Sequence, residues 1–441
     1  MGKKTILLGP FGYGNLGDAA IQEAVIQNLR RRYPEIKLWG VSLNPADTEK
    51  RHRINSFPLD RHARNAVVAA NQISLCRVES RVSFLEWVKA LLKKRVRLYW
   101  LLSTIKELWD RVGRPGRVFM SEAAHCIGAY RFLRGKDLLL ISGGGQLDEY
   151  WGGPWRQPYA LLKWCTLARL RGLKVAFLST GVGCIESRLT RLFLWSALKL
   201  SHYRSFRDEG SLELVQTRLG VRAGNYVIPD MAYSLQWPVP SLALSLVGQT
   251  ITVGIGPMSY FDPRGGVWPE QDGRVYSAYM GKLACFSFWL WQQGHTIVFF
   301  AGEVYNDRPV IRDVLEEMSR MSVNPIKERV IEEPVRDVND LLRQLARVDV
   351  AIASRFHGVL LSHLLLKPVL AIAYERKVTR LMEDMGQSQY CVNIETFNVE
   401  DLRTLFTSLV QHRETNRRLL AVRVSSCREQ AERQYSYVLS L

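Results

Sequence analysis

The apolar residues of this chain fall into short runs that alternate with amphipathic segments. Residues 5–9 form an apolar run that stops at Gly and Pro, residues 18–33 carry apolar side chains on one helical face, and residues 37–43 return to an apolar run. Uninterrupted apolar runs of this length are typical of parallel strands that are covered on both faces. The order of strand, glycine loop, helix and strand therefore predicts the first unit of a doubly wound α/β domain.

The same alternation continues along the chain, with one long break and one short one. It stops between about residues 47 and 135, resumes to residue 236, and restarts at residue 250 after the uncharged, proline-containing segment WPVPSLALSLVGQ at 237–249. We therefore predict two Rossmann-like doubly wound α/β domains that face each other across a cleft. They are residues 1–236, with a helical insertion at about 47–135, and residues 250–441, which end in a long helix. Residues 237–249 form the linker, and ligands of such sheets bind at the carboxyl ends of the strands.

Composition narrows the choice of function. The 441 residues are 47% hydrophobic, which excludes a mainly disordered chain, and 60 Lys and Arg against 42 Asp and Glu give a net charge of +18. A basic excess of this size favours an anionic partner. The seven cysteines are scattered and show no metal-ligand spacing, so we expect free thiols in a reducing compartment and no metal site. Gly and Pro interrupt the N-terminal apolar run, as they would not in a signal peptide, and we expect a cytoplasmic protein.

The predicted insertion contains a strongly basic, amphipathic stretch. Residues 77–117 carry eleven Lys and Arg against four acids, interleaved with Leu and Trp at near-helical intervals. A basic amphipathic helix with Trp can lie on an anionic membrane, so residues 80–117 are a candidate contact with the inner face of the cell membrane. The other interpretation is a helical hairpin that packs on the first domain with its basic face in solvent. The two interpretations are compatible.

Two glycine-rich loops follow predicted strands of the first domain. The sequence GYGNLG at residues 12–17 fits G-x-G-x-x-G, whose backbone and following helix N-terminus favour an anion. No acidic residue ends the next strand, as a bound NAD ribose would require, so a tight strand-to-helix turn is an equal explanation. Asp18, beside Asn15, can act as a helix cap. Gly144 and Gly145 mark either the close approach of a ligand or of the other domain, or a flexible connection.

Cationic side chains follow other strands. Arg207 would point into the cleft, where it could bind a carboxylate or phosphate, or it could pair with Asp208 or Glu209 at the surface. Arg355 and His357 lie on a predicted turn into an apolar helix, which places a fixed cation beside a group that titrates near neutral pH. From spacing alone, His357 could equally cap or pack the helix.

Five segments together resemble the polysaccharide pyruvyl transferase family. They are GYGNLGDAAI, SGGGQLDE, SFRDEGS, VIPDMA and SRFHGVLLSHLLLKPVLAIAYERKV, and they span nearly the whole chain in the order that the family has. The resemblance implies a glycosyltransferase-B-like pair of Rossmann domains. It also implies transfer of the pyruvyl group of phosphoenolpyruvate to two hydroxyls of a sugar, with formation of a ketal and release of phosphate.

The resemblance also implies roles for individual residues, and no cofactor apart from phosphoenolpyruvate as the donor substrate. His357 would be the acid/base residue. The donor would be bound by Arg207, Arg355, Phe356 and Lys377, and the sugar acceptor, a glycan or lipid-linked oligosaccharide, would face Asn15, Asp18, Gly144 and Gly145. Two positions depart from the family's pattern: Phe356 replaces the usual Leu, and Glu375-Arg376 replaces the usual Asp-Pro before Lys377.

Two other functions compete with this hypothesis. A nucleotide-sugar-dependent glycosyltransferase would use the same two-domain architecture. A non-catalytic module could bind an anionic glycan or a nucleic acid through the basic surface. The chain contains no recognised nucleic-acid motif, and we expect no nucleic-acid partner.

Overall fold

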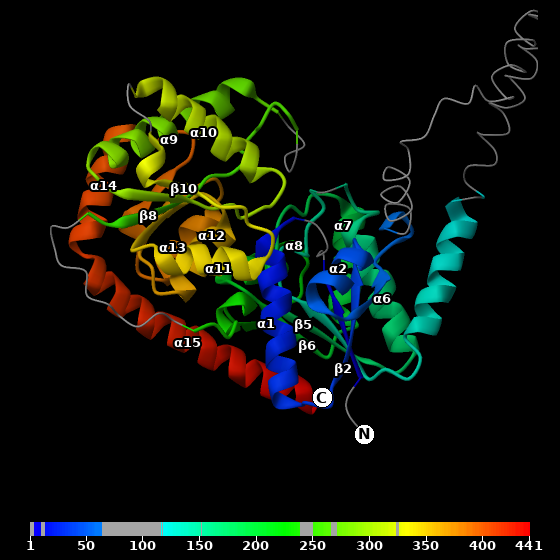
Figure 1. Ribbon diagram of the computed structural model, residues 1–441. Coiled ribbons are helices and arrows are strands. Elements are labelled where there is room, and N and C mark those ends of the chain that lie inside the picture. The colour runs from blue at the N-terminus through cyan, green and yellow to red at the C-terminus, as the bar shows by residue number, and fades with distance from the viewer. Residues whose placement is uncertain are drawn as a thin grey trace, which may run out of the picture.

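The computed structural model describes residues 4–9, 14–63, 116, 118–150, 152–238, 250–265, 271–322 and 326–441. These residues form two α/β units, each built on a parallel sheet with helices on its faces (Figure 1). The fold class predicted from the sequence is confirmed for this part of the chain. Most of the predicted linker and, except for Gly116, the basic segment 80–117 lie outside the described residues.

The first unit contains a sheet of seven parallel strands in the order β3-β2-β1-β4-β5-β6-β7. Its strands are β1 (Lys4–Leu8), β2 (Lys37–Ser42), β3 (Asn55–Pro58), β4 (Leu138–Ser142), β5 (Lys174–Thr180), β6 (Tyr203–Phe206) and β7 (Tyr226–Val227). Its helices are α1 (Leu16–Arg32), α2 (Pro45–His52), α6 (Gln157–Leu170), α7 (Arg188–Lys199) and α8 (Glu209–Arg218), followed by the 3₁₀ helix η1 (Met231–Ser234). All five residues of β4 are buried, as the run LLLIS predicts.

The second unit contains a six-stranded parallel sheet in the order β10-β9-β8-β11-β12-β13. Its strands are β8 (Thr252–Gly256), β9 (Thr296–Phe299), β10 (Val330–Glu332), β11 (Val350–Ala353), β12 (Val369–Ala373) and β13 (Cys391–Asn393). Its helices are α9 (Gly273–Gln292), α10 (Asp307–Met321), α11 (Val338–Arg347), α12 (Phe356–Leu364), α13 (Arg376–Asp384), α14 (Val399–Gln411) and α15 (Arg413–Ser440), with 3₁₀ turns at Ile326–Arg329 and Ser388–Tyr390.

The start of the predicted insertion is wrong. The sequence analysis placed it at about residue 47, but α2 and β3 lie inside that range, and β3 pairs in parallel with β2 at the edge of the first sheet. The strand NSFP is short, only partly buried and ends in Pro. It therefore lacks the apolar run by which the other strands are recognised. The doubly wound order thus continues to Pro58.

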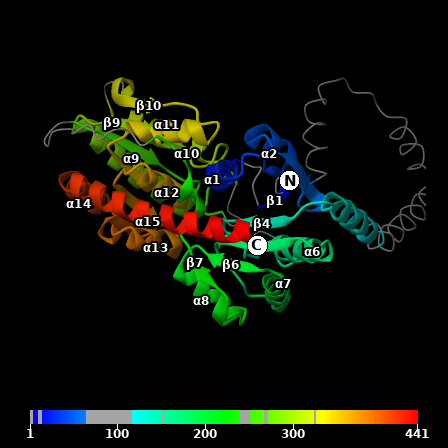
Figure 2. The same ribbon diagram turned by 90° about the horizontal axis from the view of Figure 1, so that it is seen from below.

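The long C-terminal helix connects the two units. Figures 1 and 2 show α15 running from the second unit along the first, so that its end lies beside the first sheet. Gln434 of α15 accepts a hydrogen bond from the Tyr203 hydroxyl at 3.1 Å, and Glu432 forms ion pairs with Arg31 and Arg32 of α1. The helix predicted to end the second domain therefore also packs against the first. No helix in the described part of the chain is long and apolar enough to span a membrane.

Candidate functional site

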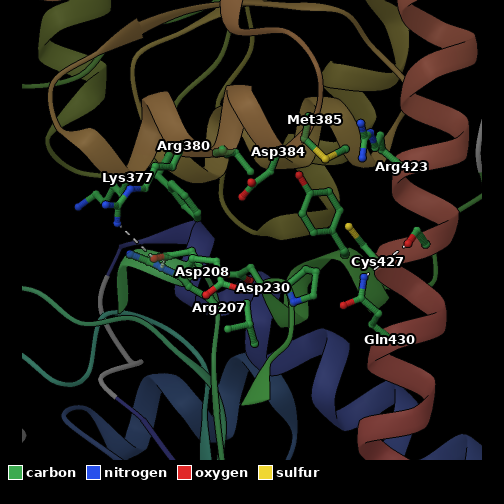
Figure 3. Close-up of a pocket in the computed structure, with 17 residues that line it drawn as sticks. Arg207, Asp208, Asp230, Lys377, Arg380, Asp384, Met385, Arg423, Cys427 and Gln430 are labelled. Carbon is green, nitrogen blue, oxygen red and sulfur yellow. Dashed lines mark hydrogen bonds and ion pairs between the residues drawn. The ribbon is translucent and has the colours of Figure 1, made fainter. Parts of the chain in front are cut away.

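A cavity of about 260 Å³ lies between the two units (Figure 3). One wall comes from the first unit, where β6 leads into α8 and β7 leads into η1, and the other comes from α12, α13 and α15. The carboxyl ends of the parallel strands thus meet here, as the fold class predicts. Cationic and acidic side chains both line it, and they are Arg207, Asp208, Glu209, Asp230, Lys377, Arg380, Asp384 and Arg423.

Arg207 reaches the cavity from the end of β6. An ideal Cβ on Gly181 would lie 2.6 Å from its Cζ, so the guanidinium fits only because residue 181 is Gly. The guanidinium also lies 4.6 Å from the centroid of the Phe356 ring and donates through Nε to the carboxylate of Asp208 at 3.2 Å. Stacking and this single hydrogen bond hold the planar group in place while the Nη side keeps its donors for an anion. Arg207 thus both pairs with Asp208 and points into the cleft, so the two alternatives predicted from the sequence occur together.

His357 is the second residue of α12, which begins at Phe356, so it lies inside the first helical turn and not on the turn before the helix, where the sequence pattern places it. Its Nε2 is 3.7 Å from Oδ2 of Asp230, a residue of the opposite unit. Asp230 is 4% exposed and caps η1 by accepting from the Ala232 N–H at 2.9 Å. Burial alone would raise the pKa of the Asp230 carboxyl, but the neighbouring His357, aided by the charge of Arg207, lowers it. An ionised carboxylate therefore faces the imidazole.

The N-terminus of α1 covers the other side of His357. An ideal Cβ on Gly17 would lie 1.9 Å from Nδ1 of His357, so any side chain there would displace the imidazole. Asn15 caps α1 by accepting from the Gly17 N–H at 3.0 Å, and its amide donates to Asp18 at 2.8 Å. Burial raises the pKa of the Asp18 carboxyl, and the charge of His357 opposes this shift. Asn15 and Asp18 thus stand beside the imidazole.

The glycines after β4 meet the same helix end. Gly143 and Gly144 have positive φ angles of 61° and 72°, which favour glycine. An ideal Cβ on Gly144 would lie 3.2 Å from Oδ1 of Asp18. Gly145 is exposed, and a Cβ built on it would have no described atom within 4 Å. Gly144 therefore lets the Asp18 carboxylate approach the backbone, so at this position the glycine loop packs against the N-terminus of α1.

Lys377 and Arg355 have different surroundings. Lys377 lines the cavity from the first turn of α13, with Nζ 2.9 Å from the Glu375 carboxylate. Burial lowers the pKa of Lys377, but Tyr374 and Glu375 outweigh it, and the net shift is upward. Arg355 is not among the residues that line the cavity, because Nε and Nη2 both donate to the buried Asp307 carboxylate at 2.6 Å.

The backbone joins the two units beside Asn15. The Leu16 N–H donates to the Gly302 carbonyl at 3.0 Å, and the Val304 N–H donates to the Gly14 carbonyl at 2.9 Å, which forms an antiparallel bridge. Arg355 supports the same loop through Asp307, whose Oδ2 accepts from the backbone N–H groups of Gly302 and Glu303. The glycine loop of the first unit is thus used for contact with the second.

The sequence analysis missed two residues of this site. Asp230 lies within the segment VIPDMA, where a carboxylate after Pro indicates only a helix cap. Arg380 lies within the helix α13 and belongs to no motif of its own. Only the packing of the two units shows that Asp230 faces His357. Among the described residues, no cluster of three or more His, Cys, Asp or Glu side chains is arranged to hold a metal ion, and the prediction that no cofactor is needed remains a prediction.

Solved structures with this fold act on sugars and sugar nucleotides. The chain is similar to UDP-GlcNAc 2-epimerase from Neisseria meningitidis bound to UDP-GlcNAc, with a TM-score of 0.52 and 9% identity over 99% of this chain and 100% of that one. It is also similar to α,α-trehalose 6-phosphate synthase from Burkholderia multivorans, with a TM-score of 0.52 and 12% identity over 100% and 97%. At such identities the likeness shows the fold alone, which is the two-domain glycosyltransferase-B architecture.

Sequence comparison gives the family. No curated protein matches the chain. A family model for polysaccharide pyruvyl transferases, however, matches residues 15–376, from the capping Asn15 to the start of α13. The matched range includes His357, Asp230 and Arg207, which meet between the two units. The chain therefore belongs to the polysaccharide pyruvyl transferase family.

Proposed function

We propose that the protein transfers the pyruvyl group of phosphoenolpyruvate to two hydroxyls of a sugar in a cell-surface polysaccharide or its lipid-linked precursor. The observation that carries this proposal is the position of His357 beside the Asp230 and Asp18 carboxylates and next to a cavity that Arg207 and Lys377 line. Family membership supports the pyruvyl transfer. That phosphoenolpyruvate is the donor, that the product is a ketal, and that the acceptor is such a glycan are parts of the proposal.

The cavity wall suits a small donor with two anionic groups. Phosphoenolpyruvate carries a phosphate and a carboxylate on the same carbon atom, C2, and binding both requires several cations within a short distance. Arg207 and Lys377 line the same cavity, and the Phe356 ring packs against the guanidinium. Charge-assisted hydrogen bonds from such groups bind the donor and stabilise the leaving phosphate as its charge develops.

The reaction requires protons to move at two places. C2 of the donor forms two bonds to sugar oxygens and loses its bond to the phosphate oxygen, while C3 gains a proton and becomes a methyl group. The two hydroxyls release two protons; one is matched by the proton that C3 gains, and the other leaves with the phosphate. A side chain that can both accept and donate a proton serves this sequence, and the imidazole of His357 is placed for it.

The two carboxylates beside His357 would have different tasks. The lowered pKa of Asp230 keeps this carboxylate charged, so that it orients the imidazole and stabilises its protonated form. The raised pKa of Asp18 lets this group exchange a proton more readily than an ordinary Asp. Asp18 and Asn15 stand at the N-terminus of α1 and would face the acceptor hydroxyls.

The test is phosphate release from phosphoenolpyruvate in the presence of lipid-linked glycans extracted from the source cells. Wild-type protein should release phosphate, and His357→Ala should release none above background while keeping the wild-type circular dichroism. Equal rates in the two proteins would remove His357 from the mechanism. Release that does not require the glycan would indicate simple hydrolysis instead of transfer.

The alternative is a nucleotide-sugar-dependent glycosyltransferase, and the fold supports it as well, since the Neisseria meningitidis epimerase structure with this architecture holds UDP-GlcNAc. Ligands that bind the native state raise the melting temperature. UDP- or GDP-sugars should stabilise a glycosyltransferase, whereas phosphoenolpyruvate should stabilise a pyruvyl transferase.

Contact with an anionic membrane through residues 80–117 remains a prediction, because these residues lie outside the described part of the chain except for Gly116. Deletion of residues 80–117 should abolish sedimentation of the protein with phosphatidylglycerol vesicles and leave its binding to neutral vesicles unchanged. Undiminished sedimentation would place any membrane contact elsewhere, such as on the arginines of α15.

A further inference from the structure

We infer that Arg380, together with the N-terminus of α8, forms the subsite that binds the phosphate group of the donor. This inference rests on the proposed function, because it assigns one end of the donor. Arg380 is on α13 and lines the same cavity as Arg207 and Lys377 (Figure 3). It lies outside the range that the family model matches, which ends at residue 376.

The position of Arg380 depends on the absence of a side chain at residue 210. An ideal Cβ on Gly210 would lie 0.9 Å from Nη1 of Arg380, so the guanidinium occupies the space where that side chain would be. Gly210 is the second residue of α8, a ten-residue helix whose first N–H groups have no partner within the helix. A cation is thus placed over a helix end that itself attracts anions.

The acids around Arg380 leave its donors available. Its Nη1 is 3.8 Å from Asp208 and its Nη2 is 4.0 Å from Glu213, and both distances exceed a hydrogen bond of about 3 Å. The Asp208 carboxylate already accepts from the Ser211 N–H at 2.7 Å and from Arg207 at 3.2 Å. Arg380 is therefore close enough to these acids to be attracted by their charge, but its N–H donors form no hydrogen bond with them.

Two further acids, Glu209 and Asp384, also line this cavity and must be compatible with a bound phosphate. Arg423 of α15 stands on the Asp384 side and adds a further positive charge there. Burial, with Asp208 and Glu383, raises the pKa of the Asp384 carboxyl, which weakens its repulsion of an anion.

A second observation independently indicates a ligand. The Tyr233 side chain lines the cavity and the residue is only 2% exposed, yet its hydroxyl has no hydrogen-bond partner among the described residues. A buried hydroxyl without a partner costs free energy that a bound acceptor group would recover. A phosphate or carboxylate oxygen in the cavity would supply that acceptor.

Arg380 also fills a role that the sequence analysis gave to Arg355. The fork of Arg355 is bound to Asp307, and Arg355 does not line the cavity. A donor with a phosphate and a carboxylate needs at least two cationic groups, and Arg207 and Arg380 face the cavity from opposite units. Binding of the donor would therefore also hold the two units together.

The experiment compares three variants in donor kinetics and in titration with inorganic phosphate. Arg380→Ala removes the cation, Gly210→Ala displaces it without changing the charge of the protein, and Arg376→Ala removes an exposed cation from the same helix as a control. The KM for phosphoenolpyruvate and the inhibition constant of phosphate should rise about tenfold to a hundredfold in the first two variants. Both values should stay at the wild-type level in Arg376→Ala.

Three outcomes would overturn the subsite. They are an unchanged KM and inhibition constant in Arg380→Ala, a change of equal size in Arg376→Ala, or wild-type phosphate affinity in a folded Gly210→Ala protein. Phosphate binding is also titrated without phosphoenolpyruvate. If the wild type does not turn over phosphoenolpyruvate but binds phosphate through Arg380, the subsite stands and only the proposed function fails.

Discussion

At the level of single residues, the proposed proton transfer depends on the pairing of His357 with Asp230. Asp230→Asn keeps the oxygen that accepts from the Ala232 N–H, and removes the charge that faces Nε2 of His357. Because that charge stabilises the protonated imidazole, kcat should fall by about 10²-fold, with a smaller change in the KM for phosphoenolpyruvate. Glu316→Gln, an exposed carboxylate on α10, is the control. An unchanged kcat in Asp230→Asn would show that the carboxylate does not act through His357.

Arg355 provides a second test at this scale. Its guanidinium and the fully buried Asp307 carboxylate form two hydrogen bonds of 2.6 Å. Arg355→Gln would leave the Asp307 charge buried without its partner, so the free energy of unfolding should fall by about 3–5 kcal/mol. Adding Asp307→Asn should restore part of this loss, since the cost comes from the unpaired charge. Denaturant unfolding of the wild type and of these two variants measures both effects, and an undiminished stability of Arg355→Gln would refute a structural role.

Some residues of this site could be singled out in the sequence because each directly follows a strand or begins a helix. Arg207, Lys377 and His357 are of this kind, and in the structure all three interact with Asp18. Asp230 could not be predicted as the partner of His357, since a cap in one domain and a histidine in the other have no fixed spacing in the sequence. The pairing of Arg355 with Asp307 is likewise a contact between distant segments.

At the scale of elements, the N-terminus of α1 has to approach α12 closely. Gly17→Ala would place a methyl group within 1.9 Å of Nδ1 of His357, so the imidazole must move. We expect a loss of activity of at least about 10²-fold. Gly281→Ala in the middle of α9 is a matched control with nothing within 4 Å of its new Cβ, and it should gain up to about 1 kcal/mol of stability. Full activity in Gly17→Ala would contradict the close packing of the two helix starts.

The helix that carries His357 also contains a second histidine, His363. The side chain is fully buried, and burial lowers its pKa to about 3. The unfolded chain therefore binds a proton below about pH 6.5 that the folded chain takes up only near pH 3. Between these two values, each unit by which the pH falls lowers the free energy of unfolding by about 1.4 kcal/mol. His363→Leu should reduce the drop in stability between pH 7 and pH 5 by about 2 kcal/mol, and an equal drop in both proteins would contradict the assignment.

Most elements could be predicted because buried parallel strands are apolar throughout and the helices between them are amphipathic. The strand β3 and the helix α2 could not, because β3 is an edge strand that is partly buried and ends in Pro. The first turn of α12 was also placed too late, since the side chains of Phe356 and His357 alone do not indicate where a helix begins.

At the scale of the whole molecule, the two units are held together by the α1 loop, the α15 helix and the charged groups between them. The net charge of +18 suggested an anionic partner without identifying it. The structure brings four basic side chains to one cavity, and they are Arg207, Lys377, Arg380 and Arg423. The charge of residues 77–117 falls almost entirely outside the described residues, so its partner stays a prediction.

Phosphoenolpyruvate is the ligand that we expect this cavity to bind. The decisive measurement is calorimetric titration of the wild type and of Arg207→Ala with phosphoenolpyruvate, beside UDP- and GDP-sugars. We expect saturable binding of phosphoenolpyruvate to the wild type, loss of that binding in Arg207→Ala, and no binding of the nucleotide sugars. Binding of a nucleotide sugar together with no binding of phosphoenolpyruvate would contradict the proposed donor.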